Sequence, residues 1–198
     1  MQPNEGLAKL QSLIEKVYLV KDPYIAKLLV AIMVSQNLPD APAWIVLVGP
    51  SGGAKSEFVN MVEKCRNVWS LSTLTAKTLV SGAKRAGGET SLLMQMGPSA
   101  IMTFKDLTSI MSESKDDKAI IMAQLREVYD GRDSKQFGTG ENITWKGKIT
   151  ILAGSTFAIH TMKQQFTTMG ERFLFYNLIQ PERIDAGRRT LENQEEGK

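Results

Sequence analysis

The segment from Trp44 to Ser56 reads WIVLVGPSGGAKS, and it decides the fold. Its first five residues form an unbroken apolar run, which is typical of a strand buried on both faces of a parallel sheet. The residues that follow are small, and they end in a lysine and a serine at the start of a helix predicted over 55–66. A glycine-rich turn in this position can direct backbone N–H groups, together with the positive end of the helix, onto phosphate oxygens. The segment therefore predicts a phosphate-binding loop.

Each polar residue of this loop has an expected role. Lys55 is placed to reach the β- and γ-phosphates of a nucleotide, and the Ser56 hydroxyl is placed to ligate Mg²⁺. Ala54 departs from the usual pattern, which has glycine at that position. The alternative is a strand-to-helix turn that binds nothing. The residues expected to bind the nucleotide are Gly49, Pro50, Ser51, Gly52, Gly53, Ala54, Lys55, Ser56 and Glu57.

Strand and helix patterns alternate on both sides of the loop. Further strands are predicted over 67–71, 100–104, 149–153 and 173–178; helices over 5–20, 23–36, 116–129 and 158–169; and a hairpin over 135–146. This alternation predicts a three-layer α/β fold with a mainly parallel five-stranded sheet. We expect an N-terminal helical segment (1–40) packed on a core (41–180), followed by a charged tail (181–198).

The composition narrows the class of protein. The 198 residues suit one domain, and 42% hydrophobic with 23% charged residues argue against disorder. The net charge of +3 permits an anionic partner without demanding one. One cysteine and one histidine exclude a disulfide scaffold within the chain and a Cys/His zinc site. The apolar runs are too short for a membrane span and the N-terminus is unlike a signal peptide, so we expect a cytoplasmic protein without a membrane partner.

A carboxylate follows the predicted strand over 100–104. In proteins with a phosphate-binding loop, an acidic residue at such a strand end holds Mg²⁺, and we assign this role to Asp106. The alternative is a helix cap before Leu107. That leucine stands where many such proteins have a glutamate that polarises the attacking water, and Glu57, Glu113 and Glu127 are the candidate substitutes.

Two further strand ends carry polar residues. Ser155 and Thr156 end the strand predicted over 149–153, where a hydroxyl could orient water or touch the γ-phosphate. Capping of the next helix is the alternative role. Arg172 directly precedes the last strand, and its importance comes from the order of the four elements along the chain rather than from its own identity.

That order resembles the AAA+ ATPase module over roughly residues 40–178. The loop with alanine before its lysine, and Arg172-Phe173, resemble the minichromosome-maintenance replicative helicases; the segments 105–110, 124–131 and 145–148 look closer to helicase-like ATPases of bacteriophages and mobile elements. The resemblance implies ATP hydrolysis in a homo-oligomeric ring, a bacterial host cell, a sensor role for Ser155 or Thr156, and an arginine finger, Arg172, that reaches the neighbouring subunit's nucleotide. The chain ends about 20 residues after its last strand, so the usual helical lid is expected to be absent or truncated.

The resemblance also implies a hairpin that contacts DNA. Residues 135–148 occupy its place and interleave cations with aromatic rings, which suits backbone tracking and base stacking. The alternative is a surface hairpin whose tryptophan folds onto the core. The candidate DNA-binding residues are Lys135, Phe137, Trp145, Lys146 and Lys148.

Three functions fit these observations. The first is an ATPase motor that acts on DNA in the replication of a phage or mobile element. The second is a nucleotide-dependent switch such as a helicase loader, with little or no hydrolysis. A small-molecule kinase is the third, and fold analogy alone does not separate them.

Overall fold

The computed structural model describes residues 3–18, 20–75, 79, 91–108, 114–136, 142–161 and 167–179. Its central sheet has five strands, all parallel, in the order β2-β3-β6-β1-β7. Their bounds are Trp44–Val48 for β1, Val68–Leu71 for β2, Ser99–Phe104 for β3, Lys148–Ser155 for β6 and Phe173–Asn177 for β7. This arrangement confirms the predicted α/β fold with its parallel five-stranded sheet.

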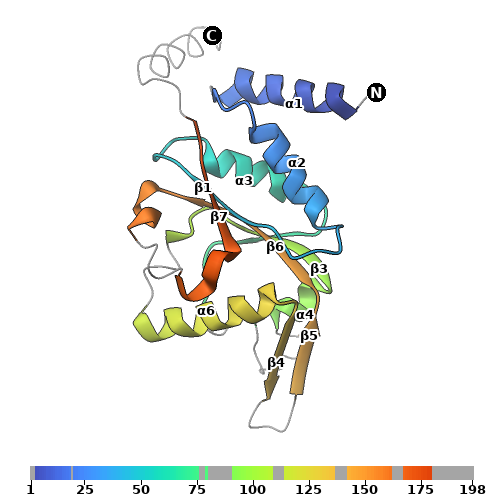
Figure 1. Ribbon diagram of the computed structural model, residues 1–198, viewed down its shortest axis with the longest axis vertical. Coiled ribbons are helices and arrows are strands. Elements are labelled where there is room, and N and C mark those ends of the chain that lie inside the picture. The colour runs from blue at the N-terminus through green and yellow to red at the C-terminus, as the bar shows by residue number, and fades with distance from the viewer. Residues whose placement is uncertain are drawn as a thin grey trace.

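Helices cover both faces of the sheet (Figure 1). One face carries α1 (Pro3–Tyr18), α2 (Ile25–Ser35) and α3 (Lys55–Glu63), and the other carries α4 (Leu92–Met96) and α6 (Lys115–Tyr129). Side chains of β1 alternate between the two cores, with Trp44, Val46 and Val48 toward α6 and with Ile45 and Leu47 toward α3. A strand buried on both sides in this way reads as one continuous apolar run.

A buried carboxylate joins the N-terminal helices to the edge of the sheet. Asp22 lies between α1 and α2 with no exposed surface, and its oxygens accept hydrogen bonds from the Tyr176 hydroxyl (2.7 Å) and from the backbone N–H groups of Tyr24 (3.0 Å) and Ile179 (3.1 Å). The neighbouring Leu178 N–H donates to the Val48 carbonyl at 2.8 Å, directly before the glycine-rich loop. The helical segment is therefore tied to the sheet beside that loop.

A separate two-stranded antiparallel sheet projects from the body near the start of β6 (Figure 1). Its strands are β4 (Arg132–Gln136) and β5 (Asn142–Lys146), so the hairpin begins three residues before the predicted start at Lys135. Close backbone packing fixes its base, because the Gly147 N–H donates to the Gly131 carbonyl at 3.0 Å and the Lys148 N–H donates to the Pro98 carbonyl at 2.8 Å. Its predicted turn over 138–140 lies outside the described residues.

The helix predicted over 158–169 is wrong where the structure describes that segment. Short 3-10 helices stand there instead, η1 over Phe157–His160 and η2 over Thr167–Arg172. Gly170, inside η2 and directly after the predicted helix, has φ +62°, a conformation that favours glycine. Residues 162–166 and the tail over 180–198 lie outside the described part of the chain. In the described part, no helix combines the length and apolar character that crossing a membrane requires.

Candidate nucleotide site

The carboxyl ends of β1, β6 and β3 meet at one edge of the sheet. Because β6 lies between the other two strands, its last residues contact the loops that follow both of them. The Gly49 N–H donates to the Ser155 carbonyl at 3.2 Å, and the Leu107 N–H donates to the Gly154 carbonyl at 2.8 Å. The glycine-rich loop and the segment that contains Asp106 are thus held on the same strand.

The loop turns tightly between β1 and α3. Gly52 has φ +74° and Ala54 has φ +58°, and the Gly53 N–H donates to the Pro50 carbonyl at 3.1 Å. A left-handed alanine is strained by roughly 1 kcal/mol or more, and strain of this kind gathers at ligand-binding loops. The first amide of α3 that bonds back is that of Phe58, to the Ala54 carbonyl; among the described residues, the N–H groups of 55–57 have no backbone acceptor. These amides are the donors that an anion at this helix end would use.

Lys55 lies at the first position of α3 and is 8% exposed. Its Nζ donates to the Pro50 carbonyl at 2.5 Å, so the ammonium group lies over the loop rather than in solvent. Burial lowers the pKa of this ammonium group, and the negative charge of Asp106 acts in the opposite direction. The lysine and the carboxylate are therefore electrostatic neighbours, although they come from different strand ends.

The Asp106 carboxylate also stabilises its own turn. Its Oδ1 accepts hydrogen bonds from the Thr108 N–H at 2.9 Å and from the Thr108 hydroxyl at 2.5 Å. The capping role considered as the alternative is thus present in the structure. The assignment of Asp106 to Mg²⁺ stays a prediction, supported by the proximity of this carboxylate to Lys55.

Of the two hydroxyl residues that end β6, Ser155 is buried beside Val48 and Thr156 is half-buried. The Ser155 hydroxyl donates to the Thr156 carbonyl at 3.3 Å. Thr156 stands at the start of η1 without a side-chain cap bond, so the capping alternative is wrong for its hydroxyl. Either residue lies at the strand end next to the loop, as the sequence predicts.

The candidate glutamates differ in their positions. Glu57 is exposed on the first turn of α3 and Glu127 is exposed on α6, while Glu113 lies outside the described residues. Leu107, which replaces the usual glutamate after Asp106, is buried in the core between the sheet and α6.

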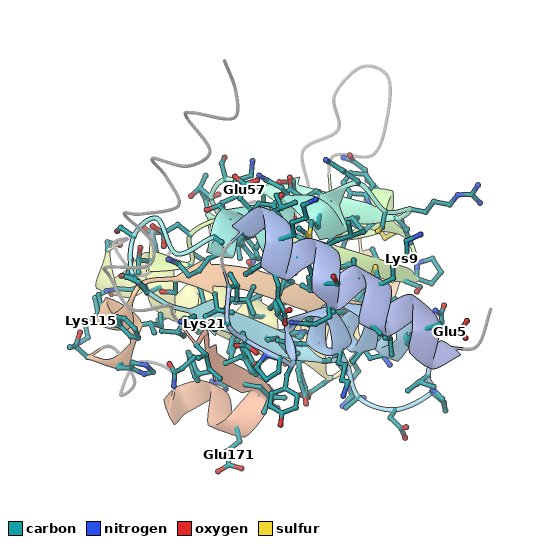
Figure 2. All side chains as sticks on the ribbon, turned by 90° about the horizontal axis from the view of Figure 1, so that it is seen from above. Glu5, Lys9, Lys21, Glu57, Lys115 and Glu171 are labelled. Atoms are coloured by element: carbon teal, nitrogen blue, oxygen red, sulfur yellow. The ribbon has the colours of Figure 1, made fainter. Side chains whose placement is uncertain are left out.

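Arg172 lies at the amino ends of the strands, whereas the loop lies at their carboxyl ends. It precedes Phe173, which pairs with the first residue of β1, whereas the loop follows the last residue of β1. Figure 2 shows Glu57, next to Ser56, and Glu171, next to Arg172, on opposite sides of the molecule. The Arg172 guanidinium donates to Asp130 Oδ1 at 3.1 Å and lies 5.1 Å from the centre of the Tyr129 ring. Arg172 therefore does not reach the loop of its own chain.

The structure corrects two of the candidate DNA contacts on the hairpin. Trp145 is 3% exposed, packs in the core and donates its indole N–H to the Gly97 carbonyl at 2.8 Å, so its ring does not face a base. Lys148 donates to the carbonyls of Ser35 (2.7 Å) and Leu38 (2.8 Å) at the end of α2, where a cation satisfies the last carbonyls of a helix. Lys146 is exposed. The Lys135 side chain and all of Phe137 lie outside the described residues.

Two residues that the sequence analysis passed over stand out in the structure. Gly154 holds the Leu107 amide, and an isolated glycine in a buried strand is the signal of such a close backbone approach. Arg132 is exposed and pairs in register with Lys146 across the hairpin. The alternation of polar and apolar residues over 142–146 is the signal in the sequence that predicts an inward Trp145 and an outward Lys146.

The residues present fit Mg²⁺ bound together with a nucleotide. Asp106 and Ser56 supply the carboxylate and hydroxyl oxygens that Mg²⁺ prefers, and this ion usually takes one or two protein ligands plus phosphate oxygens and water. In the described part of the chain, no group of three or more His, Cys, Asp or Glu residues could hold a metal ion by itself. A scan against protein-family models and a search of curated proteins found no match to this chain.

Proposed function

We propose that this protein binds ATP together with Mg²⁺ on residues 49–56 and hydrolyses it, as an AAA+-type ATPase that acts on DNA. One observation carries the proposal: the glycine-rich loop and the Asp106 segment follow different strands, and both are hydrogen-bonded to the end of β6. The negative charge of Asp106 also acts on the pKa of Lys55. Ligands of open α/β sheets bind at the carboxyl ends of the strands, and here a glycine-rich turn and a helix start lie at that edge.

Different side chains of the proposed site bind the phosphates, hold Mg²⁺ and orient the reacting groups. Lys55 and the first amides of α3 bind the phosphates, while Asp106 and Ser56 hold Mg²⁺, which supplies charge neutralisation on the phosphate oxygens when it is bound. Ser155 or Thr156 orients the γ-phosphate or the attacking water from the end of β6. Burial of Lys55 strengthens its attraction to phosphate because water screens it less.

Calorimetry with the Lys55→Met variant tests nucleotide binding. Loss of one charge-assisted contact costs about 1.5–3 kcal/mol, so we expect ATP to bind roughly 10- to 150-fold more weakly than to the wild type. Lys64→Met is the matched control, because Lys64 is exposed at the other end of the same helix. Equal ATP affinities for the wild type and Lys55→Met, or no heat of ATP binding to the folded wild type, would refute the proposed site.

A basic outer face on the hairpin supports the DNA part of the proposal. Arg132 and Lys146 are directly opposite each other and exposed, and among the described residues neither has an acidic partner. Like charges in this position destabilise a strand pair, so an anionic ligand would offset that cost. The hydroxyls of Ser134 and Thr144 continue the same face, 3.4 Å from each other. This face can track phosphates, whereas base stacking by Trp145 is not proposed.

The salt dependence of DNA binding tests this face. In the Arg132→Ser/Lys146→Ser double variant, two phosphate contacts are lost, so the slope of log affinity against log salt for single-stranded DNA becomes shallower by about 1.4. Binding of ATP should stay unchanged, because the hairpin base lies at the opposite edge of the sheet from the loop. An unaltered salt slope would remove the hairpin from the DNA-binding surface.

The assembly is proposed to be a homo-oligomer in which Arg172 completes the neighbouring subunit's site. The distance of Arg172 from the loop of its own chain supports a role at the site of a neighbouring subunit. Mixing two inactive variants, Lys55→Met and Arg172→Ala, tests this arrangement. Because each variant retains the group that the other lacks, the mixture should regain ATPase activity, and a mixture as inactive as its parts contradicts the intersubunit role.

A slowly hydrolysing switch is the second candidate, and the burial of Leu107 favours it. The position after Asp106 faces the core, so no carboxylate polarises water from there. A single-turnover measurement with bound ATP and DNA decides between the two functions. A motor should release phosphate at several per second or faster, whereas a switch should retain ATP for minutes.

A further inference from the structure

We infer that Gly154 is a positioning residue of the proposed nucleotide site, where its lack of a side chain sets the approach of the Asp106 segment to Lys55. This inference rests on the proposed function and assigns part of its geometry to a residue without any reactive group. Gly154 lies next to the last position of β6, in register with Leu47 of β1, and it faces α3 as Leu152 does.

The space around Gly154 is closed by the two functional segments. A Cβ atom at this position would lie 2.6 Å from the carbonyl oxygen of Lys105 and 3.6 Å from the Cβ of Lys55. Lys105 directly precedes Asp106, so the first of these contacts is with the backbone that carries the carboxylate. Backbone cannot rotate away as a flexible side chain can, and any larger residue must push the Asp106 segment off β6.

The same residue also holds that segment by its backbone. The Gly154 carbonyl accepts the Leu107 N–H at 2.8 Å, and the next carbonyl, that of Ser155, accepts the Gly49 N–H at 3.2 Å. Two consecutive peptide groups of β6 therefore bond the segment after β3 and the loop after β1. Relief of a 2.6 Å contact needs a shift of most of an ångström, and a misplacement of about 1 Å at a reacting centre can cost on the order of 100-fold in rate.

Gly154→Ala tests the inference, with Gly147→Ala as the matched control. A Cβ at Gly147 would meet the Pro98 carbonyl oxygen at 2.5 Å, a clash of similar size at the base of the hairpin, away from the loop. We expect both variants to lose stability. Only Gly154→Ala should lose the gain in ATP affinity that Mg²⁺ gives the wild type, by about tenfold or more, while its affinity for ATP in EDTA changes less than about threefold.

Calorimetry of ATP binding with Mg²⁺ and with EDTA separates the possible failures. If the folded wild type binds ATP in neither buffer, the proposed function fails. If the wild type binds ATP but Gly154→Ala keeps the full effect of Mg²⁺, or Gly147→Ala loses that effect equally, the positioning role of Gly154 is refuted.

Hydrogen exchange on the wild type keeps the inference testable even if Gly154→Ala does not fold. The Leu107 amide, which bonds to Gly154, should exchange at least about tenfold more slowly with ATP and Mg²⁺ than with ATP in EDTA, because Mg²⁺ fixes the Asp106 segment on β6. In a wild type that binds ATP more tightly with Mg²⁺ than in EDTA, an equal exchange rate of this amide in the two buffers would overturn the inference.

Discussion

Removal of the buried Asp22 carboxylate should be among the most destabilising single changes in this chain. The carboxylate accepts hydrogen bonds from the Tyr176 hydroxyl and from the backbone N–H groups of Tyr24 and Ile179, at 2.7, 3.0 and 3.1 Å. A hydrogen bond to an ionised acceptor contributes about 1.5–3 kcal/mol, and these three donors are left without their acceptor in Asp22→Ala. At the low end of that range, the free energy of unfolding falls by about 4.5 kcal/mol.

Two milder variants should lose less unfolding free energy than Asp22→Ala. In Asp22→Asn one acceptor oxygen remains, but the amide group presents a donor to a donor, so the loss is about 2–3 kcal/mol. Tyr176→Phe removes a single bond to the carboxylate and should cost about 1.5 kcal/mol. Urea unfolding followed by circular dichroism measures all three. The order Ala, Asn, Phe from largest loss to smallest is required, and an Asp22→Asn protein within about 0.5 kcal/mol of wild type would refute the reasoning.

The same contact gives stability a dependence on alkaline pH. Burial raises the pKa of the Tyr176 phenol above its usual value of about 10, and the hydrogen bond and negative charge of Asp22 raise it further. The folded state therefore favours the protonated phenol. The contribution of the Tyr176 phenol to the free energy of unfolding is complete below pH 10. This contribution is lost as the pH rises through the folded-state pKa of the phenol. Tyr176→Phe should flatten the fall in unfolding free energy above pH 10, measured by urea titration at several pH values.

Three smaller changes test the loop and the hairpin. Trp145→Phe loses the hydrogen bond to the Gly97 carbonyl, so the free energy of unfolding should fall by about 1–2 kcal/mol, and the affinity for DNA should not change. A weaker DNA complex of this variant would indicate that the Trp145 ring contacts DNA. Lys148→Met should destabilise the protein by about 1 kcal/mol, because its two bonds at the end of α2 are lost, and leave the salt slope of DNA binding unchanged, contrary to the role expected from the sequence. Ala54→Gly relieves a left-handed alanine but adds backbone entropy to the unfolded chain, so stability should change by less than about 1 kcal/mol and ATP affinity should be retained; loss of ATP binding would show that the alanine side chain itself matters.

The sequence could predict the elements of the candidate site because each one is encoded locally. An apolar run, a glycine-rich turn and a helix start follow each other within residues 44–63, and Asp106 follows a second, largely buried strand. Hydrophobic periodicity could also predict that β5 is a strand. The alternation of polar and apolar residues along β5 predicts an inward Trp145, whereas the interleaving of aromatic and basic residues predicts an outward one, and the structure shows the inward orientation. The same signal identifies Lys146 as the outward neighbour.

Other features depend on packing between distant segments. Arg172 carries no sign in the sequence of whether it serves its own subunit, and only the register of β7 with β1 shows that it starts at the far end of the strand. Lys148 caps a helix that ends more than 100 residues earlier in the chain. Its partners are backbone carbonyls, which have no sequence signature. Asp22 likewise gave no indication that it joins α1 and α2 to the end of β7, because two of its partners, Tyr176 and Ile179, lie more than 150 residues later in the chain.

By itself, the amino-acid sequence determined the parallel α/β class and the loop over 49–56, since a buried strand, small residues and a helix start act on their immediate neighbours. Only the tertiary structure decided that β6 lies between β1 and β3. Strand order depends on which apolar faces pack together across the whole chain, and short-range patterns do not specify it. That order bonds the loop and the Asp106 segment to neighbouring residues of β6, where the Lys105 carbonyl leaves no room for a side chain at Gly154.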